Sequence, residues 1–161
     1  MWRRSGTLLL LLLLLSVQIQ AQAGVDDCPN DWEQFNNFCY KFVKNAMTWI
    51  DAEVFCMAQR GRGSHLVSVH SDEENAFLTN FIKKKDGGAT LSWMGGTDCY
   101  KEGTWLWNDG TSWNYAKWNS GEPNNFLIEN CVLINYMVPG GWNDMSCNNK
   151  NSFVCKASRV L

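Results

Sequence analysis

The amino-acid sequence predicts a single α+β domain held together by disulfide bonds, and two observations carry that prediction. The first is the order of the patterns, because two amphipathic helical segments come first and short strands separated by polar loops follow. The second is that all seven cysteines lie after the N-terminal apolar segment. In an exported protein, cysteines in such numbers form a disulfide framework.

Residues 1–23 have the pattern of a secretory signal peptide. Two arginines precede an unbroken run of leucines at residues 8–15, and Ala21-Gln22-Ala23 has the small-x-small pattern of a signal peptidase site. The apolar run is far shorter than the roughly 20 residues that a membrane span needs, which disfavours the alternative of an uncleaved anchor. We therefore expect a secreted protein without a membrane span, whose domain covers residues 24–161.

Composition and residue pattern argue against two classes of function. Without residues 1–23 the chain keeps twelve basic against sixteen acidic side chains, and this mildly acidic balance gives no reason to expect nucleic acid as a partner. His65 and His70 are candidate catalytic bases by residue type alone. One lies in a strand pattern and the other beside a helix cap, which favours structural roles for both. No nucleophile–base arrangement is recognisable, so we do not expect an enzyme.

Helical periodicity is present in two segments. Residues 47–59 form the first predicted helix, with Thr48 as its N-cap. The second begins at Ser71, which forms a capping box with Glu74, and it ends at Gly87. Its expected buried stripe consists of Ala76, Phe77, Phe81 and Ile82.

Short strands and a hairpin are predicted outside the helices. The hairpin covers residues 28–42, and the strands cover residues 65–69, 91–94, 104–107, 132–135 and 153–156. Tryptophans are frequent after residue 88, and we expect them to fill the core and support loops rather than bind ligand. Residues 109–130 have little regular pattern, and a loop of this length in a compact domain is usually functional or held by a ligand.

Oxygen-bearing side chains gather in that loop and near its end. They form three groups: Glu122-Pro123-Asn124, Glu129 and Asn143-Asp144. Cys131 follows the first two groups and Cys147 follows the third, so a bond between these cysteines would bring the carboxylates together. Ionised carboxylates in one small site repel each other unless a cation joins them. Carboxylate and amide oxygens are the ligands that Ca²⁺ takes, and the sequence therefore predicts a Ca²⁺ site that orders the loop. A cis Glu122–Pro123 bond would turn both flanking side chains toward the ion.

Seven short motifs, standing in order across residues 28–157, resemble the C-type lectin-like domain. They are Trp49-x-x-Ala52 with Cys56, residues 65–69, Trp93-Met94-Gly95-Gly96, Trp107-Asn108-Asp109-Gly110, Glu122-Pro123-Asn124, Trp142-Asn143-Asp144 and Phe153-Val154-Cys155. The resemblance implies a double-loop fold in which two helices accompany two small antiparallel β-sheets. It also implies the disulfides Cys28–Cys39, Cys56–Cys155 and Cys131–Cys147.

The same resemblance implies a function. Glu122, Asn124, Glu129, Asn143 and Asp144 would bind both the Ca²⁺ and the sugar. In that family Glu-Pro-Asn accompanies mannose-type ligands, so we expect a secreted lectin for mannose, glucose or fucose glycans in innate recognition of microbial surfaces. Phe126 could line the sugar site. Asn125 and Asn130 stand where acids often form a second Ca²⁺ site, so that second site is expected to be weak or absent.

Two alternatives stay open. The chain also resembles fish secreted lectins and type II antifreeze proteins, so ice is an alternative ligand, and a protein ligand without sugar binding is another.

Cys99 is the seventh cysteine, and Asn130 rather than a cysteine precedes Cys131, so no extra partner for Cys99 is evident. Cys99 is therefore either a free thiol or the link of a homodimer.

Overall fold

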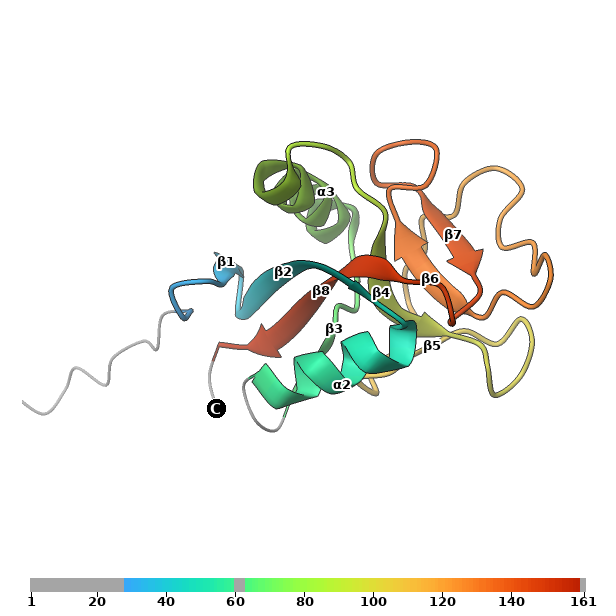
Figure 1. The fold of residues 1–161 in the computed structure, drawn as a ribbon, viewed down its shortest axis with the longest axis horizontal. Coiled ribbons are helices and arrows are strands. Elements are labelled where there is room, and N and C mark those ends of the chain that lie inside the picture. Colours follow the sequence, from blue (N-terminus) through green and yellow to red (C-terminus); the bar gives the residue numbers. More distant parts are fainter. Residues whose placement is uncertain (1–27, 60–62, 160–161) are drawn as a thin grey trace, which may run out of the picture.

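The computed structural model describes residues 28–59 and 63–159, so the predicted signal segment lies outside the described residues (Figure 1). The described part contains two helices, α2 (Trp49–Gln59) and α3 (Asp72–Asp86). Its strands, in chain order, are β1 (Glu33–Phe35), β2 (Phe38–Met47), β3 (Ser64–Leu66), β4 (Ser92–Thr97), β5 (Leu106–Trp107), β6 (Cys131–Ile134), β7 (Trp142–Met145) and β8 (Asn151–Ser158).

The strands form one hydrogen-bonded sheet in the order β1-β2-β8-β4-β6-β7, with β3 beside β8 and β5 beside β4. The α+β class is confirmed, but the two separate antiparallel sheets of the expectation are joined. Two antiparallel groups are present, and β4 and β8 connect them by parallel pairing, with Trp93 opposite Phe153. The join arises because the C-terminal strand returns to the middle of the sheet beside β4 (Figure 1).

Both helices begin as their caps predict. The Asp51 backbone N–H donates to Thr48 Oγ1 at 3.3 Å, and the Glu74 backbone N–H donates to Ser71 Oγ at 3.2 Å. Helix α3 ends at Gly87, whose φ of 83° is left-handed and whose N–H donates to the Lys83 carbonyl. The prediction of the buried stripe of α3 is partly wrong. Ala76 is exposed, and Leu78 is buried in its place because it lies one helical turn before Ile82.

Three disulfides join the pairs implied by the resemblance. Cys28–Cys39 closes the N-terminal hairpin, and Cys131–Cys147 closes the β6–β7 hairpin. Cys56–Cys155 connects α2 to β8 across 99 residues of sequence, and both of its cysteines are fully buried. Cys99 is unpaired and exposed.

Tryptophan side chains hold the long loop against the sheet, as expected. The rings of Trp113 and Trp118 each lie 5.9 Å from the buried ring of Trp142 on β7. Backbone bonds reinforce the contact, since the Trp142 N–H donates to Lys117 O at 2.9 Å. Gly96 makes room for this packing, because a Cβ there would lie 2.9 Å from the Trp113 ring. The loop is thereby fixed next to the strand that carries Asn143 and Asp144.

Candidate functional site

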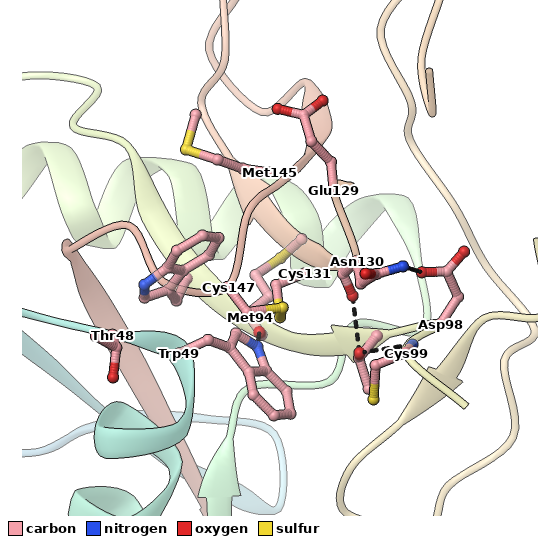
Figure 2. Close-up of a disulfide and its surroundings, with 12 residues drawn as sticks. Thr48, Trp49, Met94, Asp98, Cys99, Glu129, Asn130, Cys131, Met145 and Cys147 are labelled. Atoms are coloured by element: carbon pink, nitrogen blue, oxygen red, sulfur yellow. Dashed lines mark hydrogen bonds between the residues drawn. A yellow bond between two sulfur atoms is a disulfide. The ribbon is translucent and has the colours of Figure 1, made fainter. Parts of the chain in front are cut away.

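The predicted ligand residues lie at one end of the molecule. In Figure 1 the long loop, β6 and β7 stand at the end of the sheet opposite the N-terminal hairpin of β1 and β2. Strand β7 was not predicted, although it carries Asn143 and Asp144. It pairs with β6 so that Asp144 stands opposite Val132, and the Cys131–Cys147 disulfide closes this hairpin (Figure 2). Figure 2 also shows Glu129 on the segment that leads into Cys131.

Asp144 is the centre of the site. It is fully buried, and its two carboxylate oxygens face the loop. Oδ1 accepts the backbone N–H of Asn124 at 3.0 Å, and Oδ2 accepts that of Asn125 at 2.7 Å. Asp144 therefore sets the position of the loop backbone directly after Pro123.

The loop side chains bind one another as well. The Glu122–Pro123 peptide bond is cis, as predicted. Asn124 Nδ2 donates to Glu122 Oε2 at 2.6 Å, and Asn124 Oδ1 accepts the Phe126 backbone N–H at 2.8 Å. Asn125 Oδ1 accepts the Glu129 backbone N–H at 2.9 Å. These contacts hold Glu122, Asn124 and Glu129 together in the loop segment whose backbone is bound by Asp144.

Burial and neighbouring carboxylates both raise the pKa values of the loop acids Glu122 and Glu129. Partial burial, the adjoining Asp144 carboxylate and the charge of Glu129 raise the pKa of Glu122 above its ordinary value, against the effect of the Asn124 hydrogen bond. Burial and the charge of Asp144 likewise raise the pKa of Glu129. Burial and neighbouring negative charge thus both make ionisation of Glu122 and Glu129 harder.

Four of the five predicted ligand residues are brought together. The fifth, Asn143, makes no hydrogen bond to the loop residues Glu122, Asn124 or Glu129. Asn143 is buried, its amide donates to the Asp144 backbone carbonyl, and its side-chain oxygen has no hydrogen-bond partner. Among the residues described, no group of three or more His, Cys, Asp or Glu side chains is arranged to hold a metal ion. A site here would therefore depend on asparagine oxygens together with the carboxylates.

Asn125 and Asn130 already have protein partners. Asn125 holds the Glu129 backbone, and Asn130 Nδ2 donates to Asp98 Oδ1 at 3.0 Å. Beyond these residues, the sequence prediction missed Leu127 and Ile128, which project from the same loop beside Phe126 and are largely exposed. The available signal was a run of three consecutive large apolar residues, flanked by asparagines and Glu129, within the loop.

Comparison with known proteins agrees with this architecture. The family model for the lectin C-type domain matches residues 45–157. A lectin of Pleurodeles waltl is 42% identical over 132 residues, covering 81% of this chain and 76% of the relative. The chain therefore belongs to the C-type lectin domain family, whose members are carbohydrate-binding proteins rather than enzymes.

Two further relatives differ in what they are named for. The galactose-specific lectin nattectin of Thalassophryne nattereri is 36% identical, with 81% of this chain and 80% of nattectin covered. The structure of herring type II antifreeze protein superposes with a TM-score of 0.74 at 35% identity, covering 81% of this chain and 98% of that one.

In the described part of the chain, neither helix has the length and apolar character that crossing a membrane requires.

Proposed function

We propose that the protein is a secreted, Ca²⁺-dependent lectin that binds mannose-type sugars, including glucose and fucose, at Glu122, Asn124, Glu129, Asn143 and Asp144. The observation that carries the proposal is the set of carboxylates without a cationic partner. Burial and, after it, the nearby charge of Asp144 raise the pKa values of Glu122 and Glu129, and none of the salt bridges formed by the described residues includes these three acids.

The donors available here fit Ca²⁺. All are oxygens, which suit a hard cation, and the set mixes carboxylates with neutral amides. Asn143 Oδ1 is a buried acceptor without a partner, which is costly unless a ligand satisfies it. A bound Ca²⁺ would supply charge neutralisation and open coordination positions for sugar hydroxyls. Glu122, Glu129 and Asp144 would contribute the negative charge, and the asparagines would complete the shell without adding more.

The same side chains would orient the sugar. Glu122 and Glu129 would accept hydrogen bonds from two adjacent hydroxyls, and the amide groups of Asn124 and Asn143 would donate to them. Hydrogen bonds to ionised groups are the stronger kind, so the arrangement favours vicinal hydroxyls held between a carboxylate and an amide. Mannose-type selectivity follows from the Glu-Pro-Asn order, as the family resemblance implies.

The test is retention on immobilised mannose in millimolar Ca²⁺ and elution by EDTA. Glu122→Gln with Asn124→Asp should abolish mannose retention without lowering the melting temperature in EDTA. Glu33→Gln with Asn149→Asp makes the same two chemical changes outside the site and should leave retention intact. Lack of retention by the unaltered protein, together with retention on galactose, would overturn the mannose assignment and keep a lectin.

Ice is the second candidate ligand, and the likeness to herring type II antifreeze protein is the observation that favours it. Measurement of thermal hysteresis with Ca²⁺ and with EDTA decides the matter. Hysteresis together with failure to bind any immobilised sugar would replace the lectin proposal. If neither sugar nor ice is bound, a protein ligand is indicated.

Secretion and valency complete the proposal. Residues 1–23 would be removed on export, and detection of an N-terminus at Gly24 in the secreted protein tests this. Cys99 is exposed and unpaired, so an interchain bond between two copies would make a dimer with two sugar sites. Non-reducing electrophoresis should show a dimer that Cys99→Ser abolishes, and a monomer from the unaltered protein would assign Cys99 as a free thiol.

A further inference from the structure

Phe126, Leu127 and Ile128 form an apolar tip on the long loop. Their exposed fractions are 68%, 79% and 75%. Single exposed apolar residues are common on protein surfaces, but three large ones in succession are unusual, and gathered exposed apolar surface commonly marks a binding site.

The loop holds the apolar tip in a defined conformation. The side-chain oxygen of Asn124 accepts the Phe126 N–H at one end, and that of Asn125 accepts the Glu129 N–H at the other. Between them, Leu127 and Ile128 have φ values of 58° and 68°. A β-branched residue at positive φ is an outlier, so the backbone presents these side chains against their local preference.

The apolar tip is continuous with the proposed sugar site. Asn124 precedes it by two residues and Glu129 follows it directly, and both are proposed to bind sugar hydroxyls. Successive Cα atoms are about 3.8 Å apart, and the tip lies between Asn124 and Glu129 in the chain. A substituent on a sugar bound by these two residues would therefore lie close to the tip. The tip itself carries no charged side chain and no side-chain hydrogen-bond donor.

We propose that the apolar tip is a subsite for the alkyl chain of a glycolipid whose sugar occupies the neighbouring site. The inference rests on the proposed sugar-binding function and extends it to a ligand class. A monosaccharide alone is bound weakly by one shallow site, whereas an alkyl chain laid against three exposed apolar side chains adds burial of apolar surface. The ligand is therefore expected to be amphiphilic rather than a purely polar glycan.

The test compares methyl and octyl α-mannoside by calorimetry in Ca²⁺, with the octyl compound kept monomeric. The unaltered protein should bind the octyl compound about tenfold more tightly, the gain expected from partial burial of a few methylenes. The variant Leu127→Asn with Ile128→Asn should lose most of this preference and keep its affinity for methyl mannoside, and Phe126 is left unaltered because it could itself line the sugar site. Asparagine is chosen at 127 and 128 because it tolerates positive φ.

Met137→Asn is the matched control, since Met137 is 83% exposed and has a φ of 57° in the β6–β7 loop. It should leave the octyl preference unchanged. Equal affinity of the unaltered protein for both mannosides overturns the subsite and leaves the lectin standing. Equal weakening of both mannosides in the double variant assigns the tip to loop structure and also overturns the subsite.

Two other outcomes separate this inference from the proposed function. If neither mannoside binds, methyl and octyl galactoside are compared in the same way, and failure of all four overturns both proposals. Sedimentation of the unaltered protein as a dimer that the double variant converts to monomer would show that a second copy covers the apolar tip, which contradicts the glycolipid subsite.

Discussion

Two carboxylates in this protein are withdrawn from solvent in different ways. Glu74 at the start of α3 is 7% exposed and lies 2.6 Å from the buried ammonium of Lys156 on β8. It also accepts hydrogen bonds from the Tyr40 hydroxyl and the His70 backbone. Asp144 on β7 is fully buried, yet its carboxylate oxygens accept hydrogen bonds from the neutral backbone N–H groups of Asn124 and Asn125.

The difference separates a self-sufficient region from one suited to a ligand. Around Glu74 the chain supplies its own counter-charge, and a buried charge that is paired and hydrogen-bonded is tolerated. Around Asp144 the nearby charged groups include two further acids, Glu122 and Glu129, whose pKa values are raised. The helices and the strands beside them therefore supply stability, whereas the loop region carries the acids that we propose bind a cation.

The largest expected effect comes from the disulfide of the self-sufficient region. Replacing Cys56 and Cys155 with alanine should lower the free energy of unfolding by about 4–5 kcal/mol, because the bond closes a loop of about 100 residues. Replacing Cys131 and Cys147 should cost about 3 kcal/mol for the shorter loop but abolish sugar retention in protein that is still folded. Urea titration and retention on mannose measure the two effects, and an equal loss of stability in both variants would break the comparison.

Breaking the buried ion pair should be nearly as severe. Lys156→Met leaves the Glu74 carboxylate buried without its cation, and we expect a loss of about 3–5 kcal/mol in urea denaturation. Adding Glu74→Gln to Lys156→Met should recover part of that loss, because the unpaired charge is then removed. If the single variant keeps its stability, Glu74 does not depend on Lys156.

Calcium should stabilise the loop region by a smaller amount. Extracellular modules bind Ca²⁺ with dissociation constants of about 10⁻⁴ to 10⁻³ M, so about 10 mM Ca²⁺ should add about 1.4–2.7 kcal/mol to the free energy of unfolding. The rise in melting temperature should vanish in Asp144→Asn and persist in Asp72→Asn, which changes an exposed acid on α3. A rise that survives Asp144→Asn would place the ion elsewhere.

The smallest effect concerns Asp109, where the long loop begins. Burial raises the pKa of Asp109, but hydrogen bonds from Ser68 and Thr111 and the charge of Lys156 outweigh it, and the net pKa is lowered. The folded protein therefore holds this proton less tightly than the unfolded chain. The resulting stability is present above the ordinary Asp pKa of about 3.9 and is lost as pH falls through the lower folded value.

Asp109→Asn should remove that part of the pH dependence. Urea midpoints measured from pH 7 to pH 2.5 should fall less steeply for the variant than for the unaltered protein. An equal or steeper fall of the urea midpoint in the variant would show that other acids cause the loss of stability at low pH.

Several local features were predictable because short-range chemistry determines them. Ser71 and Gly87 bound α3 as predicted, since a hydroxyl cap and a left-handed glycine act within one turn. Strand β7 was missed because Trp142-Asn143-Asp144 has no clear alternation and is a strand only through pairing with β6. The exposure of Ala76 and burial of Leu78 depended on the side from which the sheet covers α3.

The candidate site divides in the same way. The sequence by itself determined which oxygen-bearing side chains are available to a ligand, because Glu122, Asn124, Glu129, Asn143 and Asp144 stand in order near two cysteines. Only the tertiary structure decided that Asp144 binds the loop backbone, that Asn143 Oδ1 lacks a partner and that the apolar tip faces solvent. The physical reason is that residue type sets which atoms can bind, whereas distance and burial arise from strands and loops that lie far apart in the chain.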